Sequence, residues 1–374
     1  MLKVLEQSSD PVLARKLLDR VKELAARYKE RTGNEPSFME VCGSHTMALA
    51  RTGIKALLQG HVNLISGPGC PVCVTDQKDI DAMIELADGP DRILCTFGDM
   101  MRVPGSKWSL MEAKAAGADV RPVYSPNDAL KIAASNPDKE VIFLGIGFET
   151  TIPVLAAALD AAERQQLKNF SMWVTTKLVE PVLRALLESK EVRLDGFILP
   201  GHVSIVLGRK SYRYLDEEYG MPGVICGFEP VQVLAGIYRL LELVLEGRAE
   251  IINEYTGVVT EEGNIRAQQL MEKYLEPVDE AWRGIGIIPK SGLDLRPEYD
   301  HLNAKKRFSV KIGEPRKTKC RCGEIIRGVA TPPECPLFGK ACTPAHPIGP
   351  CMVSSEGSCA AHYHYMVEAG DEVN

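Results

Sequence analysis

The sequence predicts an α/β protein with two doubly wound parallel sheets and a cysteine-rich module with helices at the C-terminal end. Short apolar runs alternate with helical stretches over most of the 374 residues, a rhythm typical of parallel strands covered by helices on both faces. Six of the eleven cysteines fall between residues 320 and 359, among Pro, Gly and basic residues. A segment this short and polar cannot build its own core, and usually needs a metal to hold it together.

The expected elements follow this alternation along the chain. Leu17, Val21 and Leu24 recur at helical spacing, so the first thirty residues are expected to form an amphipathic helix. Strands are expected at eight apolar runs: FMEVC, VNLIS, RILCTF, DVRPVY, EVIFLGI, FSMWVTT, GFILP and GVICGF. Two further helices are expected at VQVLAGIYRLLELVLEG and IRAQQLMEKYL.

The length suggests two or three domains of roughly 100–200 residues each. SPND at residues 125–128 is typical of a connection followed by a helix start. We therefore expect an N-terminal helix and a first α/β domain over residues 1–124, and a second α/β domain over residues 125–228. A helical and cysteine-rich domain is expected over residues 229–374.

Composition limits the classes of function. The net charge of −6 is spread along the chain, and no block of Lys or Arg indicates a nucleic-acid surface. Apolar runs such as VIFLGIGF are much shorter than the roughly 20 residues that cross a membrane. The N-terminus lacks the apolar region of a secretion signal, so we expect a cytoplasmic protein. In that reducing compartment, eleven cysteines favour metal binding or redox chemistry over structural disulfides.

Chemically active residues gather where the expected strands end. Ligands of open parallel sheets bind at the carboxyl ends of the strands, so seven such ends carrying Cys, His, Glu, Thr or Asp beside glycine predict one functional face. The candidate residues at these ends are Cys42, His45, Cys70, Cys73, Glu149, Thr150 and His202. None of the loops matches a nucleotide-binding motif.

Cys42 is the most suggestive single thiol. His45 lies three residues on, and a helix is expected to start beside the cysteine. Both neighbours favour the thiolate, the form that attacks or binds metal, although a buried and unreactive cysteine stays an alternative. Cys95 and Cys226 lie within apolar strands and are expected to be packing residues. His202 is either an acid/base or a donor that orients its loop.

Cys70 and Cys73 form a C-x-x-C pair within GPGCPVC. In an α/β protein of the cytoplasm, such a pair commonly forms a redox dithiol. Zinc would need two further ligands, and no second pair lies nearby in the sequence. If the strand that carries Cys42 is a neighbour, a metal-binding thiolate would stand beside a reversible disulfide. The alternative is a reduced and inert pair.

The six C-terminal cysteines are the strongest feature of the sequence. Four thiolates can saturate a 4Fe–4S cluster or a zinc ion, and two remain. The C-x₂-C-x₂-C spacing of bacterial ferredoxins is absent, so spacing alone does not choose between iron–sulfur and zinc. The two additional thiols favour a redox cluster with an adjacent disulfide.

Seven motifs occur together, and in order, between about residues 38 and 361. They are CGSHT, GPGCPVC, FGDMMRVPGS, GFETT, PGHVS, GFEP and a tail with the pattern CxCG, CP, AC and GPCMVSSEG-C. In these motifs the chain resembles the HypD family of NiFe-hydrogenase maturation proteins. The resemblance implies a scaffold on which an Fe(CN)₂CO moiety is assembled together with the small chaperone HypC. Cyanide would come from thiocyanate-bearing HypE.

The same resemblance implies roles for individual residues. Cys42 would bind the iron jointly with a cysteine of HypC, and His45 would lie beside it. The loops that carry Glu149, Thr150 and His202 would line the pocket and donate hydrogen bonds to the cyanide nitrogens. Soft thiolates in a dry pocket suit such an iron.

The tail is also similar to ferredoxin:thioredoxin reductase, in which four cysteines hold a 4Fe–4S cluster and two form a neighbouring disulfide. Carried over in order, this likeness implies as cluster ligands Cys320, Cys335, Cys342 and Cys351. Cys322 and Cys359 would then be the redox pair, and would pass electrons through Cys70 and Cys73 to the iron site.

The residues leave two other functions open. One is a free-standing iron–sulfur thiol–disulfide reductase, and the other is a binding module with a structural zinc. The expected function is that of a maturation factor with redox activity rather than of a conventional turnover enzyme.

Overall fold

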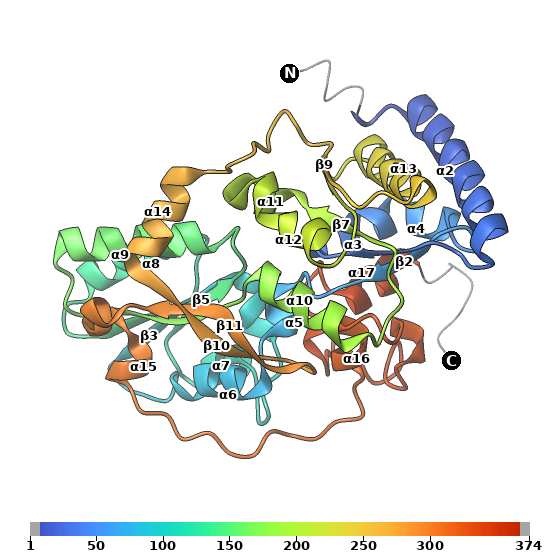
Figure 1. Cartoon of the computed structure of the whole chain (residues 1–374). Helices are drawn as coiled ribbons and strands as arrows, with labels where there is room; N and C mark the ends of the chain where they lie inside the picture. Colours follow the sequence, from blue (N-terminus) through green and yellow to red (C-terminus); the bar gives the residue numbers. More distant parts are fainter. Residues whose placement is uncertain (1–7, 367–374) are drawn as a thin grey trace.

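The computed structural model describes residues 8–366 and contains two parallel sheets that lie side by side (Figure 1). The first sheet has the order β2-β1-β7-β8-β9 and consists of β1 (Ser37–Glu40), β2 (Asn63–Ser66), β7 (Gly196–Pro200), β8 (Gly223–Cys226) and β9 (Ile251–Asn253). The second has the order β4-β3-β5-β6 and consists of β3 (Arg92–Thr96), β4 (Val120–Pro122), β5 (Glu140–Gly147) and β6 (Phe170–Thr176). The predicted α/β class, with two parallel sheets and a cysteine-rich end, is confirmed.

The strand pairing does not follow the boundary expected at residue 124. β3 and β4 belong to the sheet of β5 and β6, whereas β1 pairs with β7, Phe38 lying opposite Gly196. The chain leaves the first sheet after β2, builds the whole second sheet, and then returns. The helix start at SPND was predicted correctly, because α8 (Pro126–Ser135) begins there with Ser125 as its cap. A local signal for a helix start predicts one helix, but it contains no information about which strands pair.

Helices cover the outer face of each sheet. α2 and α13 pack on the first sheet, and α8 and α9 on the second. The longer helices are α2 (Pro11–Thr32), α3 (Gly43–Arg51), α6 (Gln77–Glu85), α9 (Ile152–Gln165), α10 (Val179–Ser189), α13 (Pro230–Glu246) and α14 (Ile265–Tyr274). The shorter ones are α4 (Ile54–Leu57), α5 (Pro71–Val74), α7 (Leu110–Ala115), α11 (Gly201–Leu207), α12 (Arg213–Glu217) and α15 (Ala304–Arg307). The helices expected near residues 10–30, 231–247 and 265–275 are therefore confirmed.

The α2 helix shows how the sequence sets these boundaries. The side chain of Asp10 accepts hydrogen bonds from the amides of Val12 and Leu13, and Pro11 occupies the first helical position. Gly33 ends the helix in the left-handed conformation, at φ +76°. Residues 1–7 of the expected helix lie outside the described part of the chain.

An antiparallel hairpin, β10 (Leu275–Trp282) and β11 (Gly286–Leu295), was not predicted. Its strands, LEPVDEAW and GIIPKSGLDL, lack the continuous apolar runs from which the parallel strands were predicted. The hairpin contacts β6 and α10. Residues 308–318 then run without regular structure along the bottom of Figure 1 to the C-terminal module.

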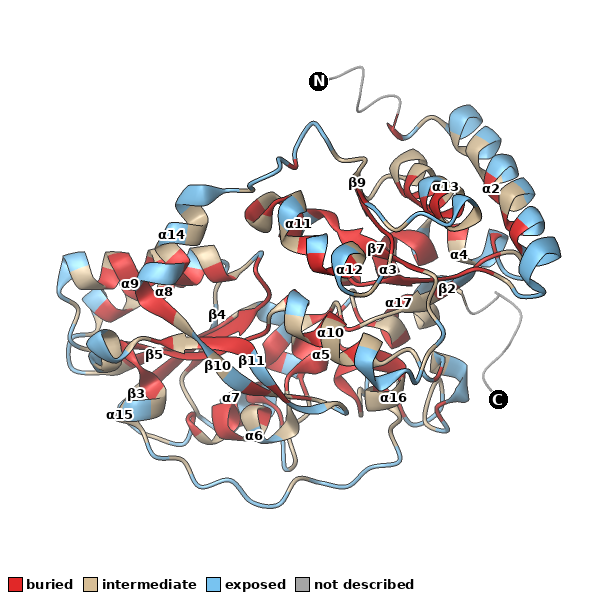
Figure 2. Ribbon diagram, in the orientation of Figure 1, coloured by how far each residue is buried: buried red, intermediate tan, exposed pale blue. Residues whose placement is uncertain are grey.

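The C-terminal module has two short helices, α16 (Cys322–Ile326) and α17 (Ser358–Tyr365), and two 3₁₀ turns, η4 (Pro332–Glu334) and η5 (Pro350–Met352). It does not form a separate core, because its buried side chains join the same apolar cluster as residues of both sheets. Figure 2 shows this continuous buried layer through the centre of the molecule. α17 packs against α3, so the last described helix lies beside the helix that follows Cys42.

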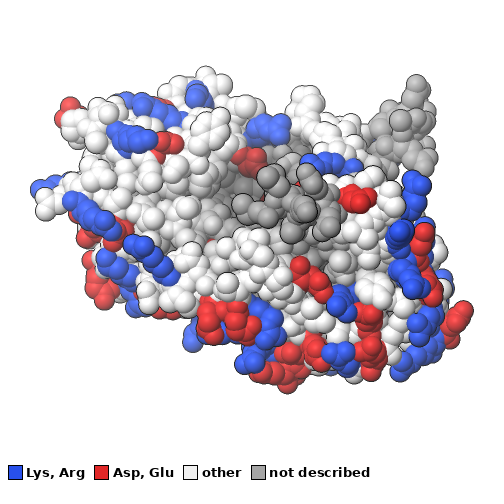
Figure 3. All heavy atoms as spheres, turned by 90° about the horizontal axis from the view of Figure 1, so that it is seen from above, with Lys and Arg blue, Asp and Glu red and all other residues white. Residues whose placement is uncertain are grey.

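Surface features agree with a chain of mixed charge. On the face seen in Figure 3, basic and acidic side chains are interspersed rather than gathered into a patch of one sign. None of the helices in residues 8–366 combines the length and the apolar character needed to cross a membrane.

A buried ion pair joins the second sheet to the hairpin. Lys177, directly after β6, is 0% exposed, and its Nζ lies 3.0 Å from Oε1 of Glu280, which is 7% exposed. Burial lowers the pKa of Lys177 and raises that of the nearby Asp79 carboxyl to about 6. The pair is therefore held in a poorly solvated place, where each charge depends on the other.

Replacing Lys177 should destabilise the protein strongly. Lys177→Met leaves the Glu280 carboxylate buried without its partner, so the free energy of unfolding should fall by roughly 3–5 kcal/mol in urea denaturation. Arg164→Met is the matched control, because Arg164 is exposed and its partner Asp160 keeps a second cation, Lys273, so stability should change by about 0.5 kcal/mol or less. A loss below about 1 kcal/mol for Lys177→Met would contradict this account.

Candidate functional site

Cys42 caps the first turn of α3, directly after β1, and its side chain is half-buried. The backbone amides of His45 and Ser44 favour its thiolate, but burial, and next the Glu356 carboxylate, raise the pKa of the Cys42 thiol to about 11. The neighbours therefore favour the Cys42 thiolate as expected, but burial outweighs them, and the thiol stays protonated in the metal-free protein. A bound cation would reverse the balance, since a coordinating thiol is deprotonated.

His45 is fully buried beside Cys42. Its Nε2 lies 3.0 Å from the carbonyl oxygen of Gly227 and 3.6 Å from Sγ of Cys226. Burial lowers the pKa of His45 to about 4, so the ring is neutral at physiological pH and donates from Nε2 to the carbonyl. Nδ1 is then an acceptor, and it has no hydrogen-bond partner among the described residues. A neutral imidazole nitrogen of this kind can bind a metal or accept a proton.

Three rings join the predicted loops PGHVS and GFEP to CGSHT. Phe228 stacks on His45 at 4.5 Å between ring centroids and on the exposed His202 at 4.1 Å. Cys226, which the sequence placed among packing residues, is fully buried as expected but touches the same histidine. The carboxyl ends of β1, β7 and β8 therefore meet at one place, as predicted.

Glu356 is a site residue that sequence reasoning missed. Ser44 Oγ donates a hydrogen bond of 2.6 Å to its Oε1, and its charge acts on both Cys42 and His202. Gly43 permits this approach, because an added Cβ would lie 2.5 Å from Cβ of Glu356. The GPCMVSSEG-C motif contains one carboxylate, that of Glu356. This residue could have been predicted as a site residue from the motif alone.

The 67–73 turn lies against Cys42. β1 and β2 are neighbours, and the amide of Gly43 donates to the carbonyl of Gly69 at 3.2 Å. A Cβ at Gly69 would stand 2.5 Å from Cα of Cys42, so no side chain fits there. Cys70 and Cys73 form a disulfide across α5 and are 5% and 2% exposed. The expected pair is thus joined and lies beside Cys42.

The other side of the disulfide faces the C-terminal module. Sγ of Cys73 lies 3.8 Å from the carbonyl oxygen of Pro350, the residue before Cys351. α5 also packs against α16, which begins at Cys322. The disulfide therefore lies between the Cys42 turn and the C-terminal cysteines.

The six C-terminal cysteines line one small cavity together with Phe338, Gly349 and Met352. They are Cys320, Cys322, Cys335, Cys342, Cys351 and Cys359. Gly349 leaves room for them, because an added Cβ would lie 2.6 Å from Sγ of Cys320. Burial raises the pKa of Cys359, and the neighbouring thiols raise it further. So many thiols cannot ionise together without cations, and this donor set fits a thiolate-bound metal group.

The four cysteines that the resemblance implies as cluster ligands and the two that it implies as a redox pair line the same cavity. Cys322 and Cys359 are free thiols, and Cys322 hydrogen-bonds with Cys320 and Cys351. Among residues 8–366, no group of three or more His, Cys, Asp or Glu has the arrangement that holds a single metal ion.

Glu149 and Thr150 are adjacent in the sequence but have different surroundings in the structure. Glu149 is buried, its Oε1 accepts from the amide of Val179 at 2.8 Å, and burial raises its pKa to about 7. Burial raises the pKa of Tyr212, and Glu149 and Cys42 raise it further, so both of these residues lie near this tyrosine. Thr150 is exposed. It was predicted as a site residue, but none of the contacts described here joins it to the site.

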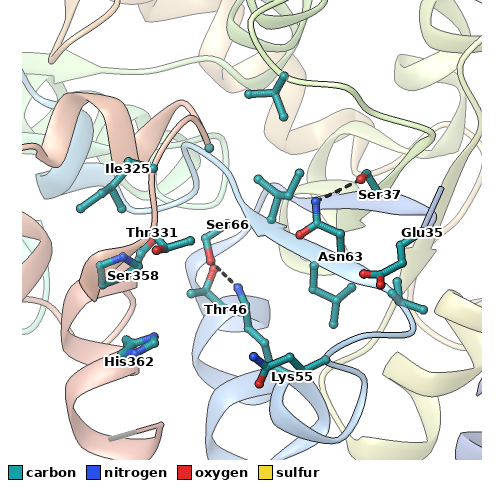
Figure 4. Close-up of a pocket in the computed structure, with 18 of the residues that line it drawn as sticks. Glu35, Ser37, Thr46, Lys55, Asn63, Ser66, Ile325, Thr331, Ser358 and His362 are labelled. Carbon is teal, nitrogen blue, oxygen red and sulfur yellow. Dashed lines mark hydrogen bonds between the residues drawn. The ribbon is translucent and has the colours of Figure 1, made fainter. Parts of the chain in front are cut away.

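A wide pocket beside the edge strand β2 lies apart from this site (Figure 4). It is lined by polar side chains of α3, β2 and α17, and includes neither Cys42 nor any of the six tail cysteines. At its floor, Lys55 Nζ donates to Oε1 of the buried Glu40 at 3.1 Å and to Ser66 Oγ at 2.9 Å. These bonds tie together the ends of β1 and β2, just before the two turns of the site.

Fold and site together define an α/β protein with two parallel sheets and a thiol-rich C-terminal module. Residues 13–366 match the family model HypD, described as "Hydrogenase formation hypA family". The hydrogenase maturation factor HypD of Rhodobacter capsulatus is 44% identical over 97% of this chain and 98% of its own. Those of Cupriavidus necator and Escherichia coli are 46% and 41% identical, each over 97% of this chain and 97% and 98% of their own. The chain belongs to the HypD family of hydrogenase maturation factors.

The raised pKa of Cys42 has a measurable consequence. In reduced, metal-free protein, iodoacetamide should alkylate Cys42 at pH 8.5 at least tenfold more slowly than a free cysteine peptide, because little thiolate forms below a pKa of about 11. The rate, read by peptide mapping, should still rise above pH 10. Glu356→Gln removes a negative charge and should speed the reaction, whereas Ser355→Ala should not. A rate that levels off near pH 9 would contradict the assignment.

Gly349→Ala should reduce metal binding in the six-thiol cavity. The added methyl group would meet Sγ of Cys320 at 2.6 Å, so one thiol must move away. After anaerobic reconstitution with iron and sulfide, iron per chain should fall at least twofold, with an unchanged far-UV circular dichroism spectrum. Gly313→Ala is the control, because nothing lies within 4 Å of a Cβ there. Equal iron content in both variants would refute this role for the cavity.

Proposed function

We propose that this chain is a scaffold and redox protein for assembly of the Fe(CN)₂CO moiety of NiFe hydrogenase. It holds the iron together with HypC and receives cyanide from HypE, in the cytoplasm, as a maturation factor rather than a conventional turnover enzyme. Membership of the HypD family supports the place in hydrogenase maturation. The observation that carries the proposal is the spatial order of the thiols: Cys42, then the Cys70–Cys73 disulfide, then the six-thiol cavity.

The iron is cargo, and Cys42 is its proposed anchor. The thiol is half-buried, so one side is supported by the protein and the other is open to a cysteine of HypC. Glu356 disfavours an empty thiolate through its negative charge, but the same charge balances a bound ferrous ion. His45 offers the free Nδ1 of a neutral imidazole beside it.

Buried polar groups around this place suit cyanide ligands. Glu149, with a pKa of about 7, is partly protonated near neutral pH and can donate a hydrogen bond to a cyanide nitrogen. His202 lies at the open edge of the ring stack and is proposed to contact the same ligands. Thr150, which is exposed, is proposed to act only at the rim.

The six-thiol cavity is the proposed site of a 4Fe–4S cluster held by Cys320, Cys335, Cys342 and Cys351, with Cys322 and Cys359 as a redox pair. When bound, such a cluster supplies electrons one at a time. The Cys70–Cys73 disulfide can take up two electrons and two protons, its S–S bond breaking to give two thiols. These electrons come from a one-electron iron–sulfur donor.

Burial of the disulfide favours this function over a free-standing reductase. Cys70 and Cys73 are 5% and 2% exposed, so the disulfide of a second protein cannot reach them for thiol–disulfide exchange. The colour of the protein distinguishes an iron–sulfur cluster from a structural zinc. Anaerobically purified protein should be brown and should absorb broadly near 400 nm. A colourless protein with one zinc per chain would refute the cluster.

Cys42→Ala should abolish iron loading while leaving the protein folded. After co-expression with the partner proteins, the wild-type complex should show cyanide bands in the infrared, and the variant should show none, because its anchoring sulfur is missing. Cys95→Ala is the control, since Cys95 lies buried in β3 of the other sheet. Unchanged cyanide bands in Cys42→Ala would refute the anchor.

A further inference from the structure

Arg283 lies at the tip of the β10–β11 hairpin and is bound to the segment that follows the disulfide. Its backbone amide donates to the carbonyl of Val74 at 2.8 Å. Its Nε donates to the carbonyl of Thr75 at 3.0 Å, and its Nη1 to Oε1 of Gln77 at 2.9 Å. Two bonds of the guanidinium group and one of the backbone therefore fix Arg283 next to α5.

The charge of this guanidinium group is not compensated. Nη2 is buried and has no hydrogen-bond partner, and no carboxylate among residues 8–366 forms a salt bridge with Arg283. Arginine cannot lose its proton at any physiological pH. Arg283 as a whole is only partly buried, but a cation with a buried, unused donor is costly unless a negative group completes it.

The C-terminal thiols are the candidates for that negative group. The hairpin tip is pressed against α16, because a Cβ on Gly284 would lie 2.2 Å from Cα of Gly323. Gly323 directly follows Cys322, the first residue of α16, and α16 also packs against α5. Arg283 therefore lies between the segment that follows the disulfide and the helix that begins in the six-thiol cavity.

We propose that Arg283 is the counter-ion of the six-cysteine centre, a positioning residue that stabilises its reduced form. The inference rests on the proposed function, in which this cavity holds an iron–sulfur cluster. One-electron reduction adds one negative charge to such a centre, and a fixed cation beside it makes the reduction more favourable. Arg283 thereby sets how readily the centre passes electrons to the Cys70–Cys73 disulfide.

The test is an equilibrium redox titration of the full-length, iron-loaded protein with dithionite, followed by electron paramagnetic resonance. In Arg283→Gln, the equilibrium constant for one-electron reduction should fall at least tenfold, which corresponds to 59 mV. Arg283→Lys keeps the charge and should stay within threefold of the wild type. Arg327→Gln is the matched control, because Arg327 bonds the same hairpin tip at Gly284 but is paired with Glu191.

The outcomes separate charge from structure. An unchanged constant in Arg283→Gln, or an equal fall in Arg283→Lys, overturns the proposal, because the second result assigns a merely structural role. If Arg283→Gln binds no iron, Arg283→Lys decides: binding with a wild-type constant supports the proposal, and failure overturns it. A wild-type protein without any iron–sulfur signal refutes the cluster itself, and the inference falls with it.

Discussion

The site depends on one backbone contact, that between the 67–73 turn and the first turn of α3. A glycine at position 69 lets the two main chains touch, where any Cβ would stand 2.5 Å from Cα of Cys42. The contact exists because β1 and β2 pair in parallel, with Glu40 opposite Ser66, and release their following turns at the same level. Lys55 bonds both of these side chains and holds the ends together. With this contact in place, the disulfide can lie beside Cys42 without any movement of the backbone.

Two charges of opposite sign stand at the two ends of the thiol series. Glu356 lies at the Cys42 end, where a cation is proposed to bind, and Arg283 lies at the other end, beside the helix that begins at Cys322. Each is placed by an element distant in sequence from the thiols that it influences: the C-terminal module brings Glu356, and the hairpin brings Arg283. The electrostatic character of the site is therefore set by tertiary packing rather than by the cysteine motifs themselves.

Much of the fold and part of the site could be predicted from the sequence, because the relevant patterns are local. The strand runs, the three long helices and the gathering of Cys42, His45 and His202 at strand ends follow from spacing alone. Strand partners could not be predicted, since β1 pairs with β7 across more than 150 residues. The protonation state of Cys42 could not be predicted, because the residues next to it in the sequence do not show how far it is buried. Glu356 and Arg283 were missed because what gives them importance is a spatial neighbour.

The hydrogen bond from Ser44 to Glu356 spans 312 positions of the chain. Cys42 precedes Glu356 in the chain and therefore leaves the ribosome first. Until Glu356 has followed, its negative charge cannot act on the Cys42 thiol, and its hydrogen bond with Ser44 cannot form. The Cys42 thiol of an unfinished chain should therefore ionise more readily than that of the folded protein.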